Sequence, residues 1–346
     1  GNIGAELKAV LDCGIFDCIV IAPALPFNKR TTVNGVHFVD GVKLADTELA
    51  KDPFAPIHHS AIVDIIKEQI DTDPGLIGLG EVRKGSLNIA QEISKLVETG
   101  TKIIVVDAAA EKHLQAAANG AGLFPGNKML CGSAGLFQYF DEAYNIDFTY
   151  RDMDRSLLAR KHSAPILVVS GSPAAMSKQQ IRYLAKKRQD VSVISFDITA
   201  VSDADVSDRV KCVINEILHN LDNGRHVVLD AAGAGKEVIL RQSQGNREKL
   251  DYHSSLILKL ISQVAHAAVS YIPLRGLVIF GGDTAVAVTK CLGAKGIEIM
   301  GQIQPYIPYG NLSGGAFSGL PVVTKAGGFG KEDSLVRIIN SLTRKT

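Results

Sequence analysis

Short runs of β-branched residues alternate with segments of helical pattern along almost the whole chain. This alternation is typical of βαβ units, in which neighbouring strands run parallel and helices cover the sheet. At roughly 100–200 residues per domain, 346 residues suffice for two domains. We therefore expect α/β architecture: two doubly wound three-layer domains, each with a mainly parallel sheet. Strands are expected at 18–22, 102–107, 165–170, 191–196, 226–230, 276–280, 297–300 and 321–325. Helices are expected at 64–70, 87–97, 111–120, 178–187, 205–221, 250–268, 285–292 and 331–342.

One segment, residues 31–44, departs from this pattern. Asn34-Gly35 and Asp40-Gly41 lie there among Val33, Val36, Phe38 and Val39. Asn-Gly and Asp-Gly favour the positive-φ turns of tight hairpins, so we expect an antiparallel β-hairpin excursion in the first domain. Such an insertion typically forms a lid or a subunit contact. A homodimer is therefore an open expectation.

The domain boundary is expected in residues 141–163, which are charged and show little strand signal. This gives a first domain at 1–155 and a second at 160–346. In doubly wound sheets, ligands bind at the carboxyl ends of the strands, so the site is expected there.

Composition excludes several classes of protein. Lys and Arg together number 37 against 36 Asp and Glu, so no net field recruits nucleic acid or a membrane surface. No apolar run reaches the ~18 residues of a membrane span. The five cysteines are an odd set without CxxC spacing, which favours reduced thiols in the cytoplasm. We expect no nucleic-acid and no membrane partner.

Glycine is enriched, with 33 residues, and it gathers where strands give way to helices. In LVIFGGDTAVAVTK, residues 277–290, a strand ends in Gly281 and Gly282 and a helix follows. Two glycines allow a tight turn and close approach of a ligand, and free N–H groups at the helix start favour a phosphate. Asp283 or Thr284 can cap this helix, and Asp283 could equally be an N-cap and nothing more.

Two further junctions strengthen this interpretation. TKAGGFGKED, residues 324–333, places Gly327 and two more glycines between a strand and a helix, and Ser170-Gly171-Ser172 follows the strand PILVV. Three such junctions in one domain point to a nucleotide. Lys29, Arg30 and Lys325 are candidate partners for a carboxylate or phosphate.

Other motifs in the sequence give weaker indications of function. DAAGAGKE, residues 230–237, lacks the first glycine and the Ser/Thr of a P-loop. His58-His59 lacks the spacing of a metal site, so no protein metal site is expected. Residues 310–319, GNLSGGAFSG, are equally consistent with a nucleotide flap or a flexible loop.

The order of the motifs resembles a known family. GGDTA at 281–285, GQIQPYIPYG at 301–310 and VVTKAGGFGKEDSL at 322–335 look like the C-terminal half of the four-carbon acid sugar kinase family. GNIGAEL at 1–7 and VVDAAAEKHL at 105–114 resemble its N-terminal half. The resemblance implies ATP-dependent phosphorylation of threonate, erythronate or 3-oxo-tetronate. The first domain would bind the acid and the second the nucleotide.

Residue by residue, the resemblance implies ATP contacts, and physical grounds make Asp283 the candidate for catalysis. Asp283 would orient Mg2+ or accept the proton of the attacking hydroxyl, the two roles that kinases give to aspartate. The implied nucleotide contacts are Ser172, Gly281, Gly282, Asp283, Thr284 and Gly327.

On the acid side, Asn2, Lys29 and Arg30 represent the site. The family's Asp-Asp-x-Thr-Gly and Lys-x-Asp-Ser-Thr-Leu-Arg motifs precede the Gly-Asn at which this chain begins, as Gly1-Asn2. A polypeptide without those motifs is expected to bind ATP without efficient turnover.

The hairpin sequence TTVNGVHFVDGVKLADTELAKDP looks more like kinases of D-threonate or D-erythronate, which phosphorylate the terminal 4-hydroxyl. A 3-oxo-tetronate 4-kinase and a non-catalytic ATP-binding α/β protein are the alternatives. The absence of a complete GxGxxG weakens a third reading, an NAD-dependent oxidoreductase.

Overall fold

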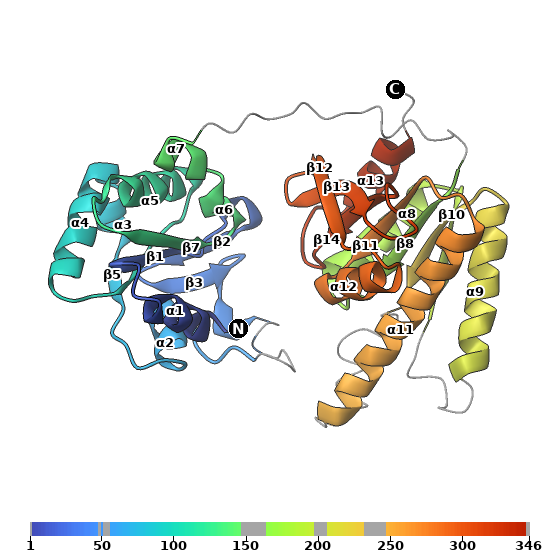
Figure 1. The fold of residues 1–346 in the computed structure, drawn as a ribbon, viewed down its shortest axis with the longest axis horizontal. Helices are drawn as coiled ribbons and strands as arrows, with labels where there is room; N and C mark the ends of the chain where they lie inside the picture. Colours follow the sequence, from blue (N-terminus) through green and yellow to red (C-terminus); the bar gives the residue numbers. More distant parts are fainter. Residues whose placement is uncertain are drawn as a thin grey trace. The chain divides into compact units, whose positions relative to one another are not determined.

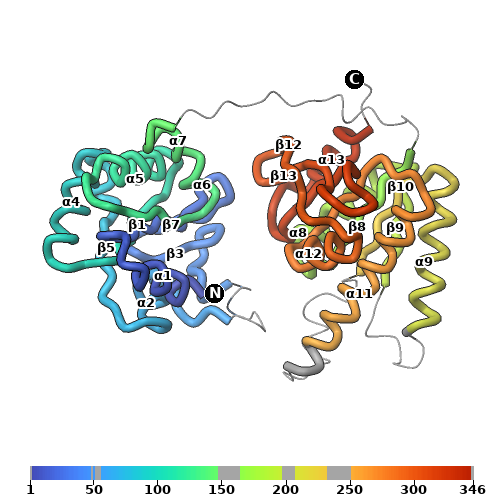
Figure 2. Tube along the Cα trace, in the orientation of Figure 1, coloured from blue at the N-terminus to red at the C-terminus, as the bar shows by residue number. Residues whose placement is uncertain are grey.

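The computed structural model describes residues 2–47, 50, 56–146, 164–196, 206–231 and 247–343. The chain divides into two compact units, Gly1–Tyr150 and Arg151–Thr346. The units follow one another along the chain without exchanging segments, as the colour change along the tube in Figure 2 shows. Of the expected boundary segment, residues 147–163 lie outside the described ranges.

The first unit is built on a parallel sheet of four strands in the order β5-β6-β1-β7. The two central strands are buried at every residue, because helices cover both faces of the sheet. The strands are β1 (Cys18–Ala22), β5 (Gly75–Ile77), β6 (Ile103–Val106) and β7 (Lys128–Gly132).

Five helices pack on one face of this sheet and two on the other (Figure 1). The first group is α3 (Leu79–Val82), α4 (Ser86–Glu98), α5 (Glu111–Leu123), α6 (Ala134–Phe137) and α7 (Phe140–Tyr144). The second group is α1 (Ile3–Asp12) and α2 (Ile62–Lys67). The unit is the three-layer α/β domain that the sequence predicts.

The expected hairpin excursion is confirmed as a small antiparallel sheet. Its strands are β2 (Arg30–Val33), β3 (Val36–Val39) and β4 (Val42–Lys43), flanked by the 3-10 turns η1 (Pro26–Asn28) and η2 (Leu44–Asp46). Both central residues of each turn have positive φ: 52° and 73° at Asn34-Gly35, 52° and 80° at Asp40-Gly41. This is the type I′ geometry that these dipeptides favour.

The second unit contains a sheet of seven strands in the order β12-β13-β14-β11-β8-β10-β9. The five from β14 to β9 are parallel, and β12 and β13 are antiparallel at one edge. The strands are β8 (Ile166–Ser170), β9 (Val191–Ser195), β10 (His226–Asp230), β11 (Gly276–Phe280), β12 (Gly296–Gln304), β13 (Ile307–Ser313) and β14 (Pro321–Lys325).

Strand β13 corrects the interpretation of residues 310–319 as a flap or flexible loop. The segment up to Ser313 is held between β12 and β14 by hydrogen bonds on both sides. Glycines at 310 and 314–315 concealed the strand, although Ile307, Tyr309 and Leu312 are buried.

Two helices of the second unit, α8 (Ala175–Lys187) and α13 (Ser334–Thr343), pack on one face of this sheet. The other face carries α9 (Val206–Asp222), α11 (Arg247–Tyr271) and α12 (Gly282–Cys291). This unit too is doubly wound. Within the described ranges, no helix has both the length and the apolar character needed to span a membrane.

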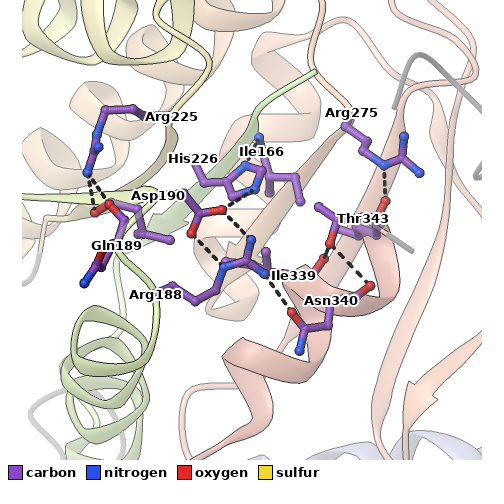
Figure 3. Close-up of polar contacts among 12 residues, drawn as sticks. Ile166, Arg188, Gln189, Asp190, Arg225, His226, Arg275, Ile339, Asn340 and Thr343 are labelled. Carbon is purple, nitrogen blue, oxygen red and sulfur yellow. Dashed lines mark hydrogen bonds and ion pairs between the residues drawn. The ribbon is translucent and has the colours of Figure 1, made fainter. Parts of the chain in front are cut away.

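A polar cluster lies at the amino ends of β8, β10 and β9, the edge opposite the glycine junctions (Figure 3). Asp190 accepts hydrogen bonds from Arg188, and these hold the pKa of its carboxyl down to about 2. His226 Nδ1 accepts the backbone N–H of Ile166 at 3.0 Å. The cluster links the first residues of β8 and β10 to Asp190, which directly precedes β9.

Candidate functional site

The three glycine junctions of the second unit meet at one edge of its sheet. Strands β8, β11 and β14 are direct neighbours, and their last residues are in register, Ser170 with Phe280 and Phe280 with Lys325. The loops that follow therefore leave the sheet side by side. We call this the carboxyl edge, and residues 326–331 the glycine loop.

Close packing joins the predicted nucleotide residues across these loops. A Cβ atom at Gly327 would lie 2.0 Å from Ser172 Oγ, so only glycine allows this approach. A Cβ atom at Gly171 would lie 2.5 Å from Thr284 Oγ1. Gly281, at φ 109°, starts the turn into α12. The structure thus brings Ser172, Gly281, Thr284 and Gly327 into one small region.

Asp283 is the second residue of α12, and its side chain is exposed. The N-cap of the helix is Gly281, and no side chain caps it, so the interpretation of Asp283 or Thr284 as a helix cap is wrong. Thr284 is buried, which leaves Asp283 as the polar side chain of this turn. A carboxylate at a helix N-terminus lies in the field that also attracts phosphate.

Sequence reasoning missed an ion pair at the same edge. Asp230 ends β10 and Lys178 lies on α8, with Nζ and Oδ2 3.5 Å apart and side chains 18% and 10% exposed for lysine and aspartate. Asp230 Oδ1 is buried without a hydrogen-bond partner among the described residues, as is Ser170 Oγ beside it in the register. The sequence signal for this pair was an aspartate at the end of the buried strand HVVLD. The mismatch of residues 230–237 to a P-loop drew attention away from it. Residues 232–237 of that motif lie outside the described ranges.

Lys325 does not have the expected role of a direct phosphate partner. It is only 2% exposed, and burial lowers its pKa to about 7. Its ammonium donates hydrogen bonds to carbonyl groups of the glycine loop itself.

In the first unit, the candidate acid-binding residues fall into different environments. Asn2 is exposed before α1, and no hydrogen bond or ion pair among the described residues joins it to Lys29 or Arg30. Lys29 is also exposed and pairs with Asp40 at 2.8 Å. An exposed ion pair is weak, so a ligand carboxylate can replace Asp40 as the partner of Lys29.

Arg30 has the stronger case as an anion-binding group. It is half-buried on β2, its Nε has no hydrogen-bond partner among the described residues, and burial lowers its pKa. Beside it, His37 accepts or donates a 3.1 Å hydrogen bond with Thr32, and burial together with the Arg30 charge lowers the pKa of His37 to about 4. A guanidinium in this setting suits a carboxylate, which it binds through paired N–H donors.

Asp107 holds the hairpin sheet in place. It follows β6, is fully buried, and accepts the backbone N–H groups of Asn34 at 2.6 Å, Gly35 at 2.9 Å and Leu79 at 3.1 Å. Burial raises its pKa above the ordinary value although the three N–H donors act in the opposite direction. Residue 32 of β2 also pairs with Ala108. The carboxyl end of β6 thus positions the strand that carries Arg30.

Comparison with known proteins matches both units. A family described as a sugar-binding N-terminal domain matches residues 1–140. A second family, described as a nucleotide-binding C-terminal domain, matches residues 167–335. This range contains the three glycine junctions.

Curated relatives match over nearly the full chain. A D-threonate kinase of Salmonella typhimurium is 31% identical over 97% of this chain and 76% of its own length. A D-erythronate kinase of Heliobacterium modesticaldum is 29% identical over 100% of this chain and 77% of its own. A 3-oxo-tetronate kinase of Pseudomonas savastanoi is 23% identical over 99% and 76%.

Solved structures share the fold. A protein from Salmonella typhimurium LT2, named provisionally as a tRNA synthase, superposes with a TM-score of 0.73 at 23% identity over 98% of this chain and 76% of that one. A Haemophilus influenzae protein gives 0.63 at 22% identity over 98% and 78%. At these identities the likeness shows the fold alone.

A sugar-binding domain followed by a nucleotide-binding domain, with glycine junctions at one carboxyl edge, defines a sugar kinase. More particularly, the chain belongs to the four-carbon acid sugar kinase family, and it is a sugar-acid kinase.

Proposed function

We propose that the protein transfers the γ-phosphoryl group of ATP to the terminal 4-hydroxyl of D-threonate or D-erythronate. The observation that carries the nucleotide half is the meeting of three glycine junctions at neighbouring strands β8, β11 and β14. In the transfer, the hydroxyl oxygen bonds to the γ-phosphorus, the bond to the β-phosphate oxygen breaks, and the hydroxyl proton passes to a base.

The choice of acid rests on the relatives and on the hairpin. The D-threonate and D-erythronate kinases above are 31% and 29% identical, whereas 3-oxo-tetronate kinases of Pseudomonas savastanoi and Brucella melitensis are 23% and 27% identical. The hairpin sequence favours the same two acids. A 3-oxo-tetronate 4-kinase is the alternative.

Arg30 supports the acid half of the proposal. The Nε of its half-buried guanidinium has no hydrogen-bond partner among the described residues, and the carboxylate of the sugar acid would supply one. Lys29 adds a second cation next to it, and Asn2 would add an amide donor.

The carboxylates at the carboxyl edge fit Mg2+. This ion is usually held by one or two carboxylates together with substrate phosphates. Asp283 offers an exposed carboxylate, and Asp230 offers a buried oxygen that has no partner among the described residues. When bound, Mg2+ neutralises charge on the phosphates. Asp283 would orient it or accept the proton of the hydroxyl, and Lys178 would hold the Asp230 carboxylate in place.

The test is ADP release by the full-length protein, coupled to a dehydrogenase readout, with D-threonate, D-erythronate and 3-oxo-tetronate at saturating ATP and Mg2+. We expect ADP release with one of the first two acids and its loss on addition of EDTA. Release with 3-oxo-tetronate alone would contradict the choice of acid. ATP binding by calorimetry without release for any acid would identify a nucleotide-binding protein in place of a kinase.

Two further properties belong to this proposal. We place the kinase in the cytoplasm, where ATP is supplied and where its five cysteines would stay reduced. The homodimer rests on the hairpin sheet as a subunit contact, and light scattering would give the mass in solution.

A further inference from the structure

Lys325 is a buried lysine at the end of β14, where the glycine loop begins. Its Nζ donates hydrogen bonds to the carbonyl oxygens of Ala326 at 2.8 Å, Gly327 at 3.0 Å and Phe329 at 3.0 Å. It lies 4.4 Å from the centre of the Phe280 ring. Three N–H groups meet three acceptors, which is the full capacity of an ammonium group. The Lys325 donors are therefore all directed at the backbone of the glycine loop.

Helix α8 holds the same loop from the sheet face that it covers. Ser177 Oγ donates to the carbonyl of Gly327 at 3.0 Å. Gln180 Nε2 donates to the carbonyls of Phe329 at 3.1 Å and Lys331 at 2.9 Å. Ser177 and Gln180 are fully buried. Three side chains thus bind four carbonyl groups of one short loop.

The inward carbonyls decide where the loop's N–H groups point. In a planar trans peptide the C=O of one residue and the N–H of the next point in opposite directions, and the chain has no cis peptide bond among its described residues. The N–H groups of Gly327, Gly328, Gly330 and Glu332 therefore point away from Lys325 and α8. Within the described part of the chain, no hydrogen bond uses these four N–H groups.

The N–H groups of Gly327 and Gly328 are consecutive, while those of Phe329 and Lys331 are used within the loop and by Ser334. Consecutive backbone N–H groups that have no partner form a concavity that binds anions. The Lys325 hydrogen bonds enforce this arrangement, because they hold the carbonyl oxygen of each peptide inward and leave its N–H outward. Gly327 also lies against Ser172, so the concavity borders the β8 junction.

We propose that Lys325 is the positioning residue of the nucleotide site: with Ser177 and Gln180 it turns the N–H groups of the glycine loop toward the phosphates of ATP. The inference rests on the proposed function. Lys325 acts through the loop and does not touch the nucleotide.

The experiment replaces Lys325 by methionine in the full chain, which keeps an unbranched side chain one atom shorter and removes the three donors. We expect the dissociation constant of ATP, by calorimetry, and KM for ATP to rise about tenfold or more, while KM for the acid stays within twofold. The matched control is Lys128→Met. Lys128 also donates to two backbone carbonyls, of Gly122 and Phe124, and lies 5.7 Å from the Tyr144 ring, but in the first unit. It should leave ATP binding unchanged.

A second, smaller variant keeps the proposal testable if Lys325→Met does not fold. Ser177→Ala removes one donor to Gly327 and should raise the ATP dissociation constant two- to fivefold. Its control is Ser94→Ala, which removes a helix serine that donates to the carbonyl of Ala90 in α4.

The outcomes separate the two proposals. If the unaltered protein binds ATP and both variants bind it equally well, the positioning role is wrong while the proposed function stands. An equal rise in KM for ATP and acid would also overturn it, because that result indicates general loss of structure. If the unaltered protein does not bind ATP, the proposed function itself fails.

Discussion

At the scale of single residues, the proposed phosphoryl transfer depends most on Asp283. It is an exposed carboxylate in the first turn of α12, and it does not cap the helix. Asp283→Asn should lower kcat by about 10²- to 10⁴-fold, the usual contribution of a positioned proton acceptor, with ATP affinity changed little. Steady-state kinetics and calorimetry measure the two quantities.

The control for this variant is Asp208→Asn, which alters an exposed carboxylate in the first turn of α9. Its kcat should match that of the unaltered protein. An unchanged kcat in Asp283→Asn would remove this residue from the catalytic machinery.

His226 makes the stability of the second unit depend on pH. Burial lowers its pKa, and the neutral ring accepts the N–H of Ile166. Because the unfolded chain binds the proton more readily, stability should be present above pH 6.5, the ordinary value, and fall as the pH drops below it. His226→Asn keeps an acceptor without titrating, so its melting temperature should fall less between pH 7.5 and pH 5.5.

His219→Asn, at an exposed position of α9, provides the control for His226 and should show the pH dependence of the unaltered protein. A melting temperature that falls equally in all three proteins would show that His226 does not contribute. Differential scanning calorimetry provides the measurement.

At the scale of elements, Asp107 joins the hairpin sheet to β6 through three backbone N–H groups. Asp107→Asn puts an NH2 group where an acceptor is needed, and should lower the free energy of unfolding by about 1–3 kcal/mol. Urea denaturation measures this. KM for the acid should rise more than KM for ATP, because β2 carries Arg30.

The comparison variant is Asp64→Asn on the exposed face of α2, which should stay within about 0.5 kcal/mol of the unaltered protein. If Asp107→Asn retains full stability, the three N–H groups do not depend on the carboxylate.

The elements also differ in how well sequence predicts them. The bounds of β1, β10, β11 and β14 coincide with expectation, because central parallel strands read as continuous apolar runs. Strands β7 and β13 were missed, since Lys128 and Gly132 in one and the glycine of the other interrupt the pattern. Helix α12 begins at Gly282, earlier than the expected start at residue 285. Glycine has a low helix propensity, so the sequence placed Gly282 in the turn before the helix.

At the scale of the whole molecule, each unit has its own apolar clusters and should respond to its own ligand. ATP at 100 times its dissociation constant should stabilise the second unit by about 2.7 kcal/mol. This corresponds to a shift of roughly 5–10 °C in one calorimetric transition. The sugar acid should shift the other.

The Asp107→Asn variant shows which calorimetric transition belongs to which unit, because it should lower only the transition temperature of the first unit. The expectation fails if ATP shifts the transition that this substitution lowers, or if both ligands shift the same one.

The sequence by itself determined the fold class, the hairpin and the three glycine junctions, because apolar period and turn dipeptides act locally along the chain. It also pointed to Asp283 and Arg30 as chemical groups. Only the tertiary structure decided that Lys325 binds the glycine loop from within, that Asp230 pairs with Lys178, and that Asp283 is not a cap. These facts depend on which strand ends lie side by side and which face a helix covers. Contacts over such distances in the chain are set by packing, which no local pattern records.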